Sequence, residues 1–79
     1  MDRIEQKWAK VASDMLVGRK IVIVRYMSED ERASMGWSNR PIVLQLDDGN
    51  MLYPSSDDEG NDAGAIFTNS EKHPVLPVI

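Results

Sequence analysis

The chain has 79 residues, no cysteine, 42% hydrophobic and 28% charged residues, and a formal net charge of −4. This length gives room for one domain over residues 1–79, and the composition excludes global disorder, a disulfide scaffold and a thiolate zinc site. Because no apolar run approaches a membrane span and the first residues lack the apolar block of a secretion signal, we expect a cytoplasmic protein without a membrane partner.

The charge is divided unevenly between the two halves of the chain. Residues 1–40 carry eight Lys or Arg and six Asp or Glu, whereas residues 41–79 carry one Lys and seven Asp or Glu. The halves therefore carry +2 and −6, which together give the net charge of −4. An acidic field opposes approach to a phosphate backbone, so nucleic acid is not an expected partner.

An amphipathic helix is expected over residues 2–16. The apolar residues Ile4, Trp8, Val11 and Met15 follow one another at steps of four, three and four, which forms one apolar stripe on a helix. The glycine at position 18 suits the left-handed residue that ends such a helix. We expect the stripe to cover the core of a sheet.

A strand is expected over residues 20–27, because the run KIVIVRYM is rich in β-branched residues. Its unbroken apolar character predicts a buried position in the sheet. Ser28 and Glu31 then have the spacing of a capping box, so a short helix is expected over residues 29–35, ending at Gly36.

The clearest hairpin signal is the pair Asp48-Gly49, which stands between two apolar runs. This pair suits the positive backbone angles of a tight turn. We therefore expect antiparallel strands over residues 41–47 and 50–54, the first beginning at Pro41.

Two further strands are expected at residues 65–68 and 74–79, and the prolines in the second suit the edge of a sheet. Together the elements predict an α+β domain in which the N-terminal helix packs on a strongly bent antiparallel sheet of four or five strands. A small barrel similar to the SH3-like or Sm-like architectures is the first choice. The Sm likeness is one of topology alone and carries no function.

The acidic loop after residue 56 is the strongest candidate for a metal site. Its carboxylates, which could together hold a hard divalent cation, are Asp57, Asp58, Glu59 and Asp62. An EF-hand is excluded, because placing Gly60 at the sixth position puts Ile66 at the twelfth, where a bidentate acid is required. A looser divalent-cation site stays an alternative to a solvated loop, and no cofactor is expected.

Catalysis has no comparable support. Ser55 or Ser56 can be combined with His73 and Asp57 into a nucleophilic trio, but no motif or spacing favours that combination. A barrel of this size also fills its interior with side chains and leaves little room for a pocket. The protein is therefore not expected to be an enzyme.

Several residues have the chemistry of a protein-binding surface. Aromatic and arginine side chains are the types that anchor interfaces, and a shaped acidic loop can attract a basic segment. The residues expected to bind a partner are Trp37, Arg40, Tyr53, Asp58 and Glu59. The alternative for the tryptophan is a place at the edge of the core.

The segments GRKIVIVRYM, GWSNRPIVLQLDDG and LYPSSDDEGNDAGAIFT carry a resemblance that spans residues 18–68. In these segments the chain resembles a family of small uncharacterised bacterial proteins, a domain of unknown function with an LDDG hairpin followed by a DDEGN loop. The resemblance implies a self-contained module and assigns no catalytic or binding residue.

Three hypotheses of function follow from these features. The first is a non-enzymatic interaction module that binds a protein partner, or itself as a homodimer, through the acidic face and the edge strand. The second is a divalent-cation-binding domain that uses the acidic loop at residues 57–62. The third is a small nucleic-acid-binding barrel that uses Arg19, Lys20, Arg25 and Arg40.

Overall fold

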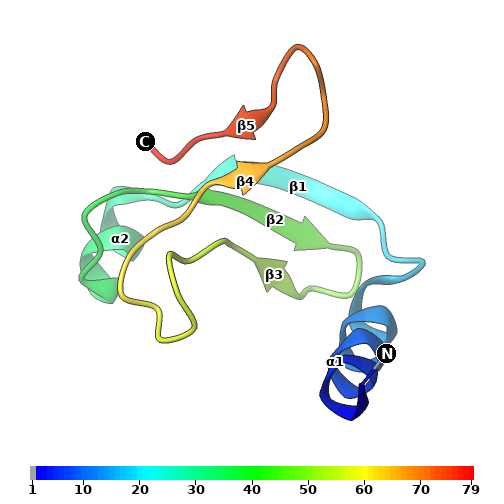
Figure 1. Cartoon of the computed structure of the whole chain (residues 1–79). Coiled ribbons are helices and arrows are strands. Elements are labelled where there is room, and N and C mark those ends of the chain that lie inside the picture. Colours follow the sequence, from blue (N-terminus) through cyan, green and yellow to red (C-terminus); the bar gives the residue numbers. More distant parts are fainter. Residues whose placement is uncertain (1) are drawn as a thin grey trace.

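The computed structural model describes residues 2–79 and has two helices and five strands (Figure 1). The elements in chain order are α1 (Arg3–Leu16), β1 (Ile21–Tyr26), α2 (Glu29–Met35), β2 (Ile42–Leu46), β3 (Met51–Leu52), β4 (Ile66–Phe67) and β5 (Val75–Leu76). The expected α+β class, the N-terminal helix and the antiparallel pairing are confirmed.

The strands divide into two separate antiparallel sheets. One sheet has the order β1-β2-β3 and the other consists of β4 and β5 alone. A single sheet of four or five strands is therefore not found among residues 2–79, and the expected barrel is not closed. The proline-flanked strand β5 lies at an edge, as predicted, but β1 is an edge strand as well.

The buried position predicted for the strand at residues 20–27 is wrong. The four aliphatic side chains of β1 are exposed, and Val24 has 58% of its surface open to solvent. As an edge strand, β1 has one neighbouring strand, β2. No helix or second sheet among residues 2–79 packs on its faces. Hydrophobic content alone therefore misjudged the depth of this strand, because burial needs partners on both faces.

Short-range interactions explain both ends of α2. The Ser28 hydroxyl accepts from the Glu31 amide at 3.2 Å, and the Glu31 carboxylate accepts from the Ser28 amide at 2.8 Å. Gly36 ends the helix with φ of 72°, a left-handed conformation that glycine adopts without steric cost. The predicted capping box and helix are confirmed.

The predicted hairpin forms, with β2 joined to β3 around Asp48 and Gly49. Only the glycine has a positive φ, of 90°, and it donates its amide to the Leu46 carbonyl at 3.0 Å. Positive angles at both turn residues were expected, and the structure instead uses a single left-handed glycine after an ordinary turn.

The N-terminal helix does not pack on the sheet, and that prediction is wrong. The helix itself begins as expected, since the Asp2 carboxylate caps it by accepting from the Glu5 amide at 2.8 Å. However, none of its residues is buried, and the element pairs in substantial contact are β1 with β2, β2 with β3 and β4 with β5. Figure 1 shows α1 set apart from the sheets at the end of the 17–20 connection.

The core is small and lies around the start of β2. Its buried residues are Met27, Trp37, Pro41, Ile42, Val43 and Leu46. The C-terminal residues lie over one side of this core. The amide of Ile79 donates to the carbonyl of Arg40, and the amide of Arg40 donates to the carbonyl of Ile79. The Tyr26 hydroxyl donates to the Pro77 carbonyl at 3.0 Å.

Candidate functional site

The acidic loop is a structured turn in which Asp57 is occupied by its own neighbours. The Asp57 carboxylate accepts from the Glu59 amide at 3.0 Å, from the Asn61 amide at 3.2 Å and from the Asn61 side chain at 2.8 Å. These hydrogen bonds, the Asn61 side chain first, lower the pKa of Asp57 from its usual value. The carboxylate therefore serves to shape the loop.

A second carboxylate of the loop, Asp62, connects the loop to the segment after α2. It accepts from the Ala63 amide at 2.8 Å and from the Ser38 amide at 3.0 Å, and these backbone hydrogen bonds lower its pKa. Of the four candidate ligands, Asp62 is half-buried, whereas Asp57, Asp58 and Glu59 are exposed. Within residues 2–79 no group of three or more Asp, Glu, His or Cys side chains is placed to hold a metal ion.

Trp37 is part of the core, so its expected role as an exposed anchor is wrong. Only 2% of its surface is accessible, and its indole Nε1 donates to the Gly60 carbonyl at 2.6 Å. Its alternative place at the edge of the core is the one observed. A buried tryptophan that holds the acidic loop presents almost no surface of its own to solvent.

The other expected partner residues lie on different parts of the surface. Tyr53 is exposed and packs against the Trp37 ring, with centroids 6.0 Å apart. Arg40 is half-buried, its guanidinium 4.0 Å from Glu29. Tyr53 therefore contacts the tryptophan that binds the loop at Gly60, whereas Arg40 is engaged by α2.

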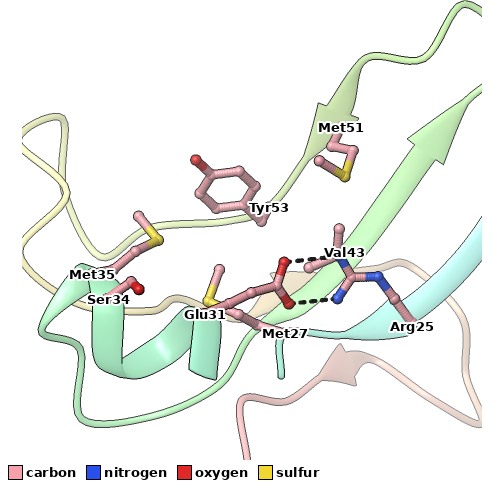
Figure 2. A pocket seen from close by; sticks show the side chains of 8 residues that line it. All are labelled: Arg25, Met27, Glu31, Ser34, Met35, Val43, Met51 and Tyr53. Carbon is pink, nitrogen blue, oxygen red and sulfur yellow. Dashed lines mark hydrogen bonds and ion pairs between the residues drawn. The ribbon is translucent and has the colours of Figure 1, made fainter. Parts of the chain in front are cut away.

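A pocket of about 270 Å³ opens between α2 and the sheet (Figure 2). Its apolar wall is made of three methionines with a valine and a tyrosine, namely Met27, Met35, Met51, Val43 and Tyr53. Flexible, polarisable thioethers adapt to differently shaped apolar side chains, so such a wall suits recognition of an apolar residue. The methionines come from separate elements, and no local sequence pattern marked them as a group.

An ion pair lines one side of this pocket. The Arg25 guanidinium donates to both oxygens of Glu31, at 2.8 Å and 3.0 Å, and Figure 2 shows the two bonds side by side. Hydrogen bonding to Arg25, followed by that to Ser28, lowers the pKa of Glu31 from 4.5 to about 2. The Glu31 carboxylate is therefore ionised at neutral pH and is held by the Arg25 guanidinium at the side of the pocket.

The cations proposed for nucleic-acid binding are mostly engaged with carboxylates. Arg19 lies 3.9 Å from Asp47 and 3.4 Å from Asp48, while Arg25 and Arg40 are paired with residues of α2. Only Lys20 of that set has no ion pair within residues 2–79. A cation already paired gains less from a phosphate, because the existing pair must first be given up.

The largest unexplained feature is apolar surface on α1 and β1. The whole α1 stripe is open to solvent, with Ile4 and Trp8 exposed to 73% and 59%. The aliphatic residues of β1 are exposed as well, and the outer edge of the strand has no neighbour among residues 2–79. Large exposed apolar patches on proteins mark interaction sites, and here the apolar side chains are divided between two elements that are not in substantial contact with each other.

The overall dimensions show that the chain is less compact than is usual for its length. The chain exposes 6111 Å², about 1,300 Å² more than the ~4,800 Å² expected for a compact protein of 8.9 kDa. Its radius of gyration is 14.1 Å, compared with about 12 Å for a compact chain of this length. The exposed apolar side chains of α1 and β1 contribute to this excess, together with others such as Phe67 on β4.

Comparisons with protein-family models, curated proteins and solved structures find no match. The resemblance to a bacterial family therefore stays a prediction. Among the helices of residues 2–79, none combines the length and the apolar character needed to cross a membrane. The candidate site is thus defined by the geometry of this chain alone.

Proposed function

We propose that this protein is a non-enzymatic interaction module that binds a protein partner or a copy of itself through α1 and the edge strand β1. The observation that carries the proposal is the apolar surface of these two elements, which no other part of residues 2–79 covers. Burying exposed aliphatic and aromatic side chains is the dominant favourable term in most protein association.

The methionine pocket supports the same function. Its apolar wall and its paired charges offer space for one apolar side chain of a partner and no reactive group. Tyr53 forms part of this wall and contacts Trp37, which in turn holds the acidic loop at Gly60. A partner segment seated in the pocket therefore lies close to the acidic face.

The two alternatives have less support. A divalent cation has to compete for Asp57 and Asp62, which the loop backbone already occupies. A nucleic acid has to displace the carboxylates that pair with Arg19, Arg25 and Arg40. Protein binding requires neither exchange.

In-cell photo-crosslinking tests the proposal. A photoreactive phenylalanine analogue is placed in turn at position 8 on α1, at position 24 on β1, and at position 67 as the control. Phe67 is exposed to 82% but lies on β4, outside the proposed surface. We expect protein adducts, with the same chain or another, from positions 8 and 24 and far fewer from position 67. If positions 8 and 24 give no adduct, the proposal is wrong.

Salt dependence separates the apolar surface from the acidic face. An apolar contact keeps its affinity when sodium chloride is raised, whereas binding through exposed carboxylates weakens as charges are screened. We expect the adduct yields at positions 8 and 24 to persist at high salt in vitro. If the complex instead dissociates as the sodium chloride concentration is raised, the partner is recognised by the acidic loop.

A further inference from the structure

The geometry points to a second copy of this chain as the partner, joined to the first along β1 so that the two three-stranded sheets become one continuous antiparallel sheet. This inference rests on the proposed function and names the partner for the same surface. The sequence led us to expect association through the edge strand at residues 74–79, whereas this inference assigns it to β1.

The outer edge of β1 presents free backbone groups at defined positions. The Met27 amide donates to the Pro41 carbonyl and the Asp47 amide donates to the Lys20 carbonyl, both at 2.9 Å and both between β1 and β2 or their extensions. In an antiparallel pair the direction of the backbone groups alternates along the strand. The groups of Val24 and Tyr26 therefore point away from β2, toward solvent.

These two residues define one symmetric register. A two-fold axis beside Arg25 places Val24 of each copy opposite Tyr26 of the other, and each such pair exchanges two N–H to C=O hydrogen bonds. The Tyr26 carbonyl already accepts from the Arg25 guanidinium at 3.1 Å, and its second lone pair is free for the new bond. Valine opposite tyrosine is also a favourable cross-strand pair.

The charge at the axis is balanced within each copy. Two Arg25 side chains approach each other in this register, which alone opposes association. Each is bonded through both nitrogens to its own Glu31, so the groups that meet are ion pairs and not free cations. The bulge between Ile21 and Ile23 limits regular pairing to the second half of β1, where this register lies.

The apolar side chains of the joined strands also give α1 a surface to pack on. Among residues 2–79 of one copy the Trp8 stripe packs on no other element, and no second layer lies over β1. Joining two β1 strands doubles the width of the apolar surface, which the two α1 helices then cover. The excess exposed area of about 1,300 Å² per chain exceeds the ~800 Å² that each partner buries in a standard interface.

Mass measurement with edge variants tests the dimer. Light scattering of the wild type is expected to give twice the chain mass of 8.9 kDa. Val24→Pro removes the outward amide, and Val24→Lys keeps it but adds a charge at the interface; a proline is tolerated on the outer side of an edge strand. We expect either change to weaken dimerisation about 100-fold, and the matched surface control Phe67→Lys to leave it unchanged.

Disulfide trapping tests the register, since the chain has no cysteine of its own. Opposed residues in a hydrogen-bonded pair have Cα atoms about 5.5 Å apart, within the range that a disulfide spans. The double variant Val24→Cys, Tyr26→Cys is expected to form covalent dimers on mild oxidation, faster than either single variant. Faster trapping of Val24→Cys alone overturns the proposed register.

The outcomes separate the dimer from the wider proposal. A wild type that stays at 8.9 kDa at all concentrations, while position 24 still crosslinks to other proteins, overturns the dimer and leaves the interaction module standing. A monomer that gives no adducts at all overturns both. A dimer that Val24→Pro and Val24→Lys do not affect overturns the assignment of β1.

Discussion

Trp37 and Gly60, separated by 23 positions in the sequence, are joined by a hydrogen bond of 2.6 Å from the indole Nε1 to the glycine carbonyl. The bond connects the segment after α2 to the acidic loop, and Tyr53 packs on the same indole ring. The Trp37 side chain therefore links three parts of the protein: the small core, the pocket wall and the acidic loop.

Trp37→Phe is therefore expected to destabilise the protein by about 1–3 kcal/mol, from the lost hydrogen bond and the smaller ring. Chemical denaturation followed by circular dichroism measures the change. Trp8→Phe, compared in a Val24→Lys background that is expected to be monomeric, is the matched control. Trp8 is 59% exposed and the Lys7 ammonium lies 5.4 Å from its ring, so the replacement is expected to stay within about 0.5 kcal/mol. Equal losses in the two variants contradict the assignment of Trp37 to the core.

Substitution of Gly64 is expected to destabilise the protein because the Ser55 backbone lies close to its Cα, and not because of the Gly64 backbone angle. A Cβ at this position lies 2.8 Å from the Ser55 carbonyl oxygen and 2.9 Å from its carbon, so the backbone at one of the two residues has to move. We expect Gly64→Ala to cost about 1–3 kcal/mol in unfolding free energy.

Gly60→Ala provides the comparison for Gly64→Ala. Gly60 has φ of 73° with open space around it, so an alanine there meets backbone strain alone, about 1 kcal/mol. Denaturation midpoints of both variants distinguish the two causes. A smaller loss at Gly64 than at Gly60 contradicts the close packing of the loop against Ser55.

Stability is expected to fall as the pH is lowered from about 5 toward 2. The folded pKa of Glu31 is about 2, below its usual 4.5, so its contribution is complete above the unfolded value and is lost as the pH falls through the folded one. The pKa values of Asp57 and Asp62 are lowered too and act in the same direction.

Glu31→Gln tests this pH dependence. The variant is expected to be less stable than the wild type at pH 7 and to approach it at pH 2, where about half of the wild-type carboxylate is protonated in the folded state. Asp58→Asn removes the same charge from an exposed side chain without a hydrogen bond among residues 2–79, and serves as the control. A constant difference between Glu31→Gln and wild type across this range argues against the Arg25–Glu31 pair as the cause.

Calcium or magnesium is expected to produce no saturable change in the amide NMR signals of residues 57–64. Asp57 and Asp62 already accept hydrogen bonds from the loop backbone, which a cation has to break before it can bind. Titration of metal-free protein with each ion measures this. Saturable shifts confined to this loop contradict it and restore the divalent-cation alternative.

The helicity of α1 is expected to depend on association. An isolated helix of 14 residues is marginal in water, so α1 needs a surface for its apolar stripe. Val11→Lys is expected to weaken the dimer and to reduce the ellipticity at 222 nm. Ser13→Lys, on the opposite side of the helix, is the control and is expected to change neither. Full helicity in a dilute monomer contradicts the coupling.

The sequence by itself determined the local elements of this protein. The Asp2 cap and the apolar spacing of α1, the Ser28–Glu31 box and the turn at Gly49 all act between residues a few positions apart. Such interactions are visible in the order of residues, so the helices and the hairpin were predicted close to their observed bounds.

Only the tertiary structure decided which apolar surfaces are covered. The hydrophobicity of β1 and of the α1 stripe was evident in the sequence, but whether another part of the chain packs on them depends on contacts between distant segments. The same holds for the burial of Trp37 and for the pocket, whose methionines come from separate elements. Hydrophobic attraction has no direction, so a sequence pattern identifies a surface that needs a partner without identifying the partner.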